Sequence, residues 1–234
     1  MYPEPGSNAL VILAGGKSRR MGTDKVFLDY QGSSFLEHLI RKAVPYFDRI
    51  LISAGSAAHA QQIRQFLAQP ERPEGRPLPE IIPDHYDSLG PAGGLMSVFE
   101  ETGLDSFAAV AVDLPDADMQ VLSCLESLLK TIRQEPPASP KPCAVMLALH
   151  PEHPEPCAAA YHRFAYGLLK SASEAGIRSP FRAIGKERIL FVTPEELKKS
   201  SPCFLGLDFE TSFRNINTME DLAATVPASD SDAR

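Results

Sequence analysis

The stretch that decides the fold is residues 8–25, which read NALVILAGGKSRRMGTDK. Its first part, residues 8–14, is a short apolar run with β-branched residues, and it stops at Gly15 and Gly16. An apolar run of this length that ends at glycines is typical of a buried parallel strand leading into a loop. The two glycines would let backbone N–H groups approach an anion closely. The stretch therefore predicts a strand followed by a phosphate-binding loop.

Basic residues are concentrated in this loop, although the chain as a whole carries a formal net charge of −7. Mutual repulsion among clustered cations is best relieved by a bound anion, and a triphosphate would balance these charges. A solvated basic turn is the alternative interpretation, and the order of strand, glycines and basic residues argues against it. The basic side chains are those of Lys17, Arg19, Arg20 and Lys25.

Two better-known nucleotide motifs do not match the loop. Residues 16–18, Gly-Lys-Ser, resemble the end of a P-loop, but that motif requires a glycine five positions before Gly16, where Val11 stands. The Gly-x-Gly-x-x-Gly fingerprint of dinucleotide-binding folds is also absent. The loop is therefore expected to bind a nucleotide in another way, and hydride transfer is not supported.

Apolar periodicity outside the loop alternates between strand-like and helix-like segments. This alternation implies a mostly parallel sheet with helices on both faces and ligands beyond the carboxyl ends of its strands. Two proline-rich stretches, residues 69–79 and 134–142, are interpreted as surface loops. Strands are predicted at 8–14, 49–54, 80–83, 107–112, 144–149, 158–161, 189–192 and 213–216, and helices at 34–45, 57–68, 95–102, 119–133 and 164–175.

Composition places the chain among globular proteins and argues against other classes. With 234 residues, of which 44% are hydrophobic, it can build a sizeable core, and we expect one domain over 8–225 with tails at 1–7 and 226–234. Its negative charge argues against nucleic-acid binding. The sequence has no run of about 18 apolar residues and no signal-peptide order, which predicts a cytosolic, cytoplasmic protein without membrane contact. Its four scattered cysteines are expected to be reduced thiols.

The loop at residues 13–25 resembles the signature of the nucleotidyltransferases that build molybdenum cofactor dinucleotides, above all the molybdenum cofactor guanylyltransferases. Further segments agree with that family in the same order, so the resemblance covers residues 8–225. It implies a single-domain, Rossmann-like α/β fold of the nucleotide-diphospho-sugar transferase type. The agreeing segments are Pro83-Asp84, Gly90-Pro91-Ala92-Gly93-Gly94, Val112-Asp113-Leu114-Pro115 and the closing stretch FRNINTMEDL at 213–222.

The resemblance implies roles for individual residues. Asp113, at the end of an apolar strand, would hold Mg²⁺, and Asp84 would contact the nucleotide, although either carboxylate could simply stabilise a turn. Asn215 and Asn217 are candidates for the acceptor site or for a structural role before a helix capped by Thr218. The expected catalytic residues are Lys25, Arg20 and Asp113, and the expected GTP-binding residues are Leu13, Ala14, Gly15, Gly16, Lys25, Asp84 and Asp113.

The sequence departs from the family pattern at three positions. Ser53 stands where the family commonly has asparagine, and its hydroxyl offers fewer donors than an amide, which leaves its nucleotide contact open. Ala92 stands where leucine is usual, and Met219 replaces a proline. In contrast, Gly15 and the two asparagines of the closing stretch resemble the guanylyl branch of the family more than the cytidylyl branch.

The reaction implied by the resemblance is transfer of GMP from Mg-GTP to the phosphate of molybdenum-molybdopterin, which yields the guanine dinucleotide cofactor and pyrophosphate. In-line transfer between phosphates requires positioning and charge neutralisation, and no side-chain nucleophile. Mg²⁺ is the expected cofactor, and proteins that insert or deliver the molybdenum cofactor are expected partners. Two alternatives stay open: cytidylyl or other nucleotidyl transfer on the same fold, and a catalytically silent adaptor that binds a nucleotide or a pterin.

Overall fold

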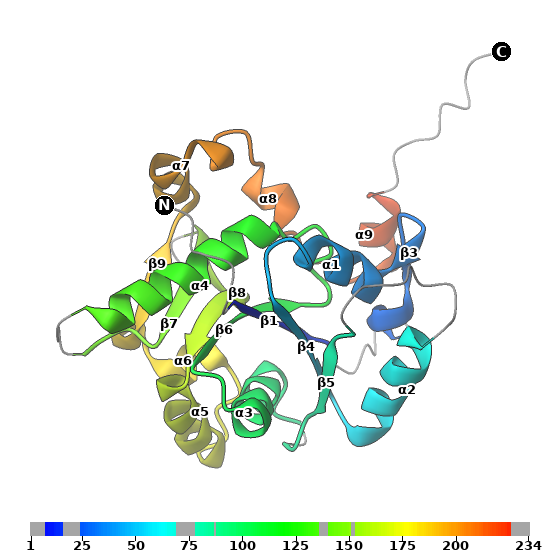
Figure 1. Cartoon of the computed structure of the whole chain (residues 1–234), viewed down its shortest axis with the longest axis horizontal. Helices are drawn as coiled ribbons and strands as arrows, with labels where there is room; N and C mark the ends of the chain where they lie inside the picture. The colour runs from blue at the N-terminus through cyan, green and yellow to red at the C-terminus, as the bar shows by residue number, and fades with distance from the viewer. Residues whose placement is uncertain are drawn as a thin grey trace.

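The computed structural model describes residues 8–15, 24–68, 78–86, 88–135, 140–150 and 153–225. Within these residues, seven strands form one sheet in the order β5-β4-β1-β6-β8-β7-β9, and two short strands form a separate hairpin (Figure 1). The strands of the large sheet are β1 Ala9–Leu13, β4 Arg49–Ala54, β5 Glu80–Pro83, β6 Ser106–Ala111, β7 Ala144–His150, β8 His153–His162 and β9 Ile189–Val192. The hairpin strands are β2 Asp29–Tyr30 and β3 Ser33–Ser34.

The described strands of the large sheet run parallel, with the exception of β8. Strand β1 pairs in parallel with β4 and β6, β4 with β5, and β7 with β9. Strand β8 runs antiparallel between β6 and β7, and its register with β7 shifts on either side of Leu147. The mostly parallel α/β sheet predicted from the sequence is therefore confirmed.

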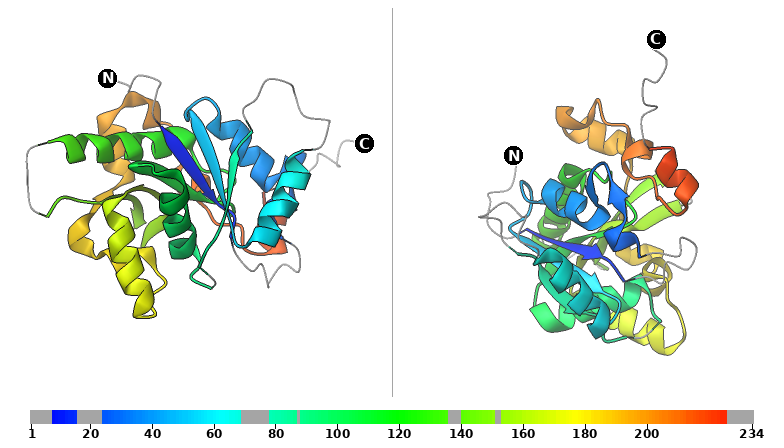
Figure 2. Two further views of the ribbon diagram at one scale, coloured as in Figure 1. Left: turned by 60° about the horizontal axis from the view of Figure 1, so that its bottom comes forward. Right: turned by 90° about the vertical axis from the view of Figure 1, so that its right-hand side faces the viewer.

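Helices cover both faces of this sheet, as the two views of Figure 2 show. Buried side chains of α1, α2 and α4 belong to the core on one face, and those of α3, α5 and α6 to the core on the other. The five helices predicted from periodicity are present, with ends that differ by a few residues, and so is the short helix expected after a Thr218 cap. The α-helices are α1 Phe35–Ala43, α2 Ala57–Leu67, α3 Pro91–Thr102, α4 Met119–Gln134, α5 Phe164–Glu174, α6 Pro180–Ile184, α7 Pro194–Ser200, α8 Phe209–Ser212 and α9 Met219–Ala223, and the 3₁₀ turns are η1 Lys25–Phe27, η2 Lys186–Arg188 and η3 Pro202–Phe204.

Strand β1 is apolar at every position because both of its faces are covered. Leu10 and Ile12 point into the core on the α1 and α4 side, whereas Val11 and Leu13 point into the core on the α3 and α5 side. Successive strand side chains project to opposite faces, so a strand between two helical layers needs a continuous apolar run. This is the physical reason that residues 8–14 are so informative.

Helix α3 begins at Pro91, four residues before the predicted start at residue 95. The prediction was wrong there because Gly93 and Gly94 disfavour a helix by intrinsic propensity. The structure shows what these glycines provide: a Cβ atom at Gly94 would collide with the Oγ atom of Ser53, which lies on β4. The loss in propensity is therefore offset by close packing of the helix on the sheet, and Pro91 at the first helical position favours the start.

The strand predicted at residues 213–216 is also wrong. This segment follows the short helix α8 and has no strand assignment, although Phe213 and Ile216 are 2% and 1% exposed. Its apolar pattern comes from packing against the core, and the N–H group of Ile216 donates a hydrogen bond to the carbonyl oxygen of Asp113 at 2.9 Å. Strand β8, by contrast, is longer than the predicted 158–161. The predicted tails, residues 69–77 of the first predicted loop and residues 136–139 of the second lie outside the described residues.

One ionisable side chain is enclosed in the core beneath β1. Glu126 of α4 is 0% exposed, and its Oε1 atom lies 2.9 Å from the Nζ atom of Lys130. Burial raises the pKa of Glu126 to about 7, an effect that the charge of Lys130 only partly opposes. The pKa of this group is higher in the folded state than its ordinary value of 4.5. The stability that the neutral carboxyl contributes is therefore lost as the pH rises from 4.5 through about 7.

We therefore expect the change in the free energy of unfolding caused by Glu126→Gln to be about 2–3 kcal/mol more favourable at pH 8.5 than at pH 5, because glutamine cannot ionise. Lys130 would keep its hydrogen bond to the Oδ1 atom of Asn8 (2.9 Å) and is 26% exposed, so its charge stays solvated. Urea unfolding of both proteins at the two pH values measures the difference. An equal change in the free energy of unfolding at both pH values would show that burial does not raise the pKa of this carboxyl group.

Candidate active site

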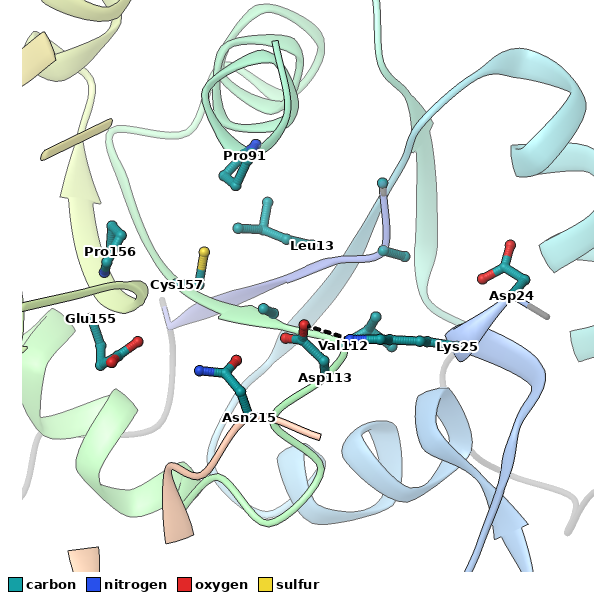
Figure 3. Close-up of a pocket in the computed structure, with 13 residues that line it drawn as sticks. Leu13, Asp24, Lys25, Pro91, Val112, Asp113, Glu155, Pro156, Cys157 and Asn215 are labelled. Atoms are coloured by element: carbon teal, nitrogen blue, oxygen red, sulfur yellow. Dashed lines mark hydrogen bonds and ion pairs between the residues drawn. The ribbon is translucent and has the colours of Figure 1, made fainter. Parts of the chain in front are cut away.

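A cavity of the described structure lies where the strand order reverses. From β1 the chain moves outward through β4 to β5, and it then crosses to β6 on the other side of β1. In open α/β sheets, ligands bind beyond the carboxyl ends of the strands at such a point. The cavity there has a volume of about 380 Å³ and is shown in Figure 3. Its lining residues are Leu13, Ala14, Gly15, Asp24, Lys25, Pro91, Ala111, Val112, Asp113, Glu155, Pro156, Cys157 and Asn215.

The floor of the cavity is the end of β1. The N–H group of Ala14 donates to the carbonyl oxygen of Ser53 at 2.9 Å, so the hydrogen-bonded ladder continues one residue beyond the strand. At Gly15 a Cβ atom would lie 2.7 Å from Oδ2 of Asp84 and 3.1 Å from Cα of Gly55. Only a residue without a side chain fits this position without displacing its neighbours. The close approach brings the end of β1 against Asp84.

Lys25 and Asp113 form the charged centre of the cavity, and Figure 3 shows them facing each other. The Nζ atom of Lys25 lies 3.0 Å from Oδ2 of Asp113 and donates to Oδ1 of Asn217 at 2.8 Å. The side chains of Lys25 and Asp113 are 12% and 24% exposed, so solvent screens this ion pair only in part. Lys25 is placed by Asp24, whose Oδ1 atom accepts the N–H group of Val26 and caps η1.

The two asparagines of the closing stretch have different positions. Asn215 lines the cavity, whereas Asn217 reaches it through its contact with Lys25. The N–H groups of Asn217 and Thr218 both donate to Oδ2 of Asp221 at 2.8 Å, in the capping box of α9. Asn217 thus has the structural role before the capped helix that the sequence offered, through its backbone, and its side chain contacts the candidate catalytic residue Lys25. A role of either asparagine in the acceptor site stays a prediction.

Asp84 lies directly behind Gly15 and is not part of the cavity lining. Its Oδ1 atom accepts a hydrogen bond from the hydroxyl of Ser53 at 2.6 Å, and its N–H group donates to the carbonyl oxygen of Ala54 at 2.6 Å. Burial raises the pKa of Asp84 to about 6, against the lowering effects of the Ser53 hydrogen bond and of nearby His59 and His85.

Some predicted site residues are brought together, and others lie outside the described residues. Leu13, Ala14, Gly15, Lys25 and Asp113 meet at the cavity. Gly16 and Arg20, predicted to bind GTP and to act in catalysis respectively, lie outside the described residues, as do the other basic residues between them.

The sequence did not identify several lining residues. Asp24 precedes the predicted Lys25 in the sequence. It lines the cavity because it caps η1, which was not predicted from the sequence. Glu155, Pro156 and Cys157 come from β8 and form the side of the cavity opposite Asp24 in Figure 3. Burial raises the pKa of the Cys157 thiol to about 12, so this group stays protonated and is a poor nucleophile.

The described residues of the cavity could supply only a minority of the ligands of a magnesium ion. Among the described residues, no group of three or more His, Cys, Asp or Glu side chains could hold a metal. Mg²⁺ is usually bound through one or two carboxylates, water and substrate phosphates. The cavity offers one such carboxylate, that of Asp113, so water and substrate phosphates would have to supply the other ligands.

A cavity at the switch point with a lysine, a carboxylate and no activated side-chain nucleophile among the described residues suits a group transfer between phosphates. Fold and site together fit an α/β nucleotidyltransferase of the nucleotide-diphospho-sugar transferase fold. The chain belongs to the MobA-like NTP transferase domain family, whose sequence profile matches residues 10–189.

The names of similar proteins are consistent with this family. The chain is 29% identical to a probable molybdenum cofactor guanylyltransferase of Rhodopirellula baltica, over 91% of this chain and 88% of the relative. It is 26% identical to the molybdenum cofactor guanylyltransferase of Syntrophotalea carbinolica, over 90% and 87%. The crystal structure of molybdopterin-guanine dinucleotide biosynthesis protein A from Archaeoglobus fulgidus is similar in fold, with a TM-score of 0.70, 23% identity and coverage of 92% of this chain and 95% of that one. In the part of the chain that is described, no helix has the length and apolar character needed to span a membrane.

Proposed function

We propose that this protein transfers GMP from Mg-GTP to the terminal phosphate of molybdenum-molybdopterin, which forms the guanine dinucleotide cofactor and releases pyrophosphate. The observation that carries the proposal is the Lys25–Asp113 pair, 3.0 Å apart, in a cavity at the switch point of the sheet. A volume of about 380 Å³ lies in the range of small-molecule sites. The names of the relatives support the choice of substrates.

The transfer forms one bond and breaks one bond at the α-phosphorus. An oxygen of the molybdopterin phosphate attacks the α-phosphorus of GTP, and the bond to the bridging oxygen of the β-phosphate breaks as pyrophosphate leaves. Negative charge accumulates on the transferring and leaving oxygens, so the protein accelerates the step mainly by positioning and neutralisation. A phosphate nucleophile needs no protein base to activate it.

We assign this neutralisation chiefly to Lys25. Its ammonium group contacts both Asp113 and Asn217, and a bound triphosphate would compete for it with more charge. Gly15 and Gly16 would offer backbone N–H groups to the phosphates, and Arg20 would bind the leaving pyrophosphate. When Mg²⁺ is bound, Asp113 would hold it, and the ion would neutralise phosphate oxygens.

The remaining site residues are proposed to bind the two substrates. Leu13 and Ala14 would form the surface on which the nucleoside lies, and Asp84, behind Gly15, would accept hydrogen bonds from the donor edge of the base. Asn215 lies on the part of the cavity that we propose for the acceptor. We further propose that the reaction takes place in the cytoplasm, within one domain over residues 8–225, and that delivery and insertion proteins supply molybdenum-molybdopterin and receive the product.

The experiment that tests the proposal measures Mg²⁺-dependent pyrophosphate release from GTP in the presence of molybdenum-loaded molybdopterin. ATP, CTP and UTP serve as controls, and omission of the pterin gives the background. We expect release with GTP alone, dependent on the pterin. A preference for CTP would assign cytidylyl transfer instead, and binding of GTP without any release would favour an adaptor.

A further inference from the structure

A buried contact joins the ends of two neighbouring strands next to the cavity. Ser53 lies near the end of β4 and Asp84 directly follows β5, and these two parallel strands pair over four residues. The Ser53 hydroxyl donates to Oδ1 of Asp84 at 2.6 Å, a short distance typical of a hydrogen bond to a charged acceptor. Ser53 itself is 1% exposed, so it cannot touch a molecule in the cavity.

Two glycines fit the backbone closely around this contact. A Cβ atom at Gly94 would collide with Oγ of Ser53, so α3 encloses the hydroxyl from one side. A Cβ atom at Gly15 would lie 2.7 Å from Oδ2 of Asp84, so the second carboxylate oxygen faces the end of β1 at the cavity floor. The Ser53 hydroxyl therefore binds one oxygen of Asp84, while the other is directed at the backbone where the nucleotide is expected.

We propose that Ser53 is a positioning residue, whose hydroxyl fixes the Asp84 carboxylate in the orientation and the ionised state that receive the nucleotide. This inference rests on the proposed function, because it requires Asp84 to meet the nucleotide. It explains how serine can serve at a position where the family commonly has asparagine: the residue acts through Asp84 and makes no contact with the ligand.

Electrostatics support this role independently of the packing. Burial raises the pKa of Asp84 to about 6, and the Ser53 hydrogen bond opposes this effect. The other titratable groups facing the carboxylate, among described residues, are His59 of α2 and His85 of its own loop. His59 has its own acidic neighbour, because its Nε2 atom lies 3.0 Å from Oδ2 of Asp24. Loss of the Ser53 hydroxyl should thus raise the Asp84 pKa further and favour the neutral carboxyl.

The test compares Ser53→Ala with the parent in the pyrophosphate-release assay with Mg-GTP. We expect the KM for GTP to rise about 10-fold with less than about a twofold change in kcat, because a hydrogen bond to a charged group is lost. The acidic limb of kcat/KM, which reports the free enzyme, should move to higher pH. In an Asp84→Ala background the same substitution should add less than about twofold, since no carboxylate remains to position.

Ser97→Ala is the matched control. Ser97 is a buried serine of α3 whose hydroxyl contacts the backbone of His85 and Gly93 and not the carboxylate. It should lower stability without moving the acidic limb. The same shift in both variants would overturn the inference, because it would reflect loss of packing in general.

A nucleotide-free measurement separates this inference from the proposed function. NMR titration of the Asp84 carboxyl carbon in the unliganded parent and in Ser53→Ala should give a higher pKa in the variant. Identical titrations would overturn the inference even if the enzyme transfers GMP. A failure of the parent to release pyrophosphate from GTP would instead count against the proposed function, while the carboxyl titration would still decide whether Ser53 acts on Asp84.

Discussion

Lys25→Ala is expected to reduce kcat for pyrophosphate release from Mg-GTP by about 10²- to 10³-fold, the loss seen when one group that stabilises developing negative charge is removed. Lys25 is the described cation whose ammonium group lies in the cavity, and its Nζ atom is held 3.0 Å from the Asp113 carboxylate. Alanine would leave that carboxylate without its partner and the phosphates without the charge. The measurement is steady-state release at saturating GTP and molybdenum-molybdopterin.

The control for this variant is Lys199→Ala. Lys199 is an exposed lysine in the last turn of α7, so its removal changes the net charge equally without touching the cavity. Thermal unfolding of both variants would verify that they are folded. A kcat of Lys25→Ala within about fivefold of the Lys199→Ala value would refute the role assigned to Lys25.

Asp113→Asn is expected to reduce kcat by about 10²- to 10³-fold and to raise the Mg²⁺ concentration needed for half-maximal activity. Asparagine keeps the size of the side chain and an oxygen that can accept from Lys25. The bond from the Ile216 N–H group to Asp113 uses the main-chain carbonyl, so the substitution should preserve the position of the closing segment. A titration of activity with Mg²⁺ at fixed GTP measures both effects.

Asp29→Asn provides the matched control, because Asp29 is exposed on the small hairpin strand β2. It removes one negative charge without altering the cavity. If Asp113→Asn had the same Mg²⁺ dependence as this control but lower kcat, Asp113 would act by orienting Lys25 and not by holding the ion. Unchanged kcat in Asp113→Asn would exclude both roles.

Local sequence patterns located the strands of the sheet and its crossover helices, although not all of their ends. Apolar runs identified strands such as β1 and β4 because their side chains are buried between two helical layers. The same reasoning failed for residues 213–216, whose apolar side chains pack on the core without joining a strand. It also placed the start of α3 too late, because propensity gives no information about the packing that requires Gly94.

The sequence by itself determined the α/β class, the strand and glycine order of the loop, and Lys25 and Asp113 as candidates, because these depend on periodicity and on motifs that are contiguous in the chain. Only the tertiary structure decided that Lys25 contacts Asp113 and Asn217, which are 88 and 192 positions away, and that the buried Ser53 hydroxyl donates to Asp84. The physical reason is that the topology of a parallel sheet brings the ends of distant strands to one edge, and side-chain contacts across that edge depend on register and packing that no local pattern encodes.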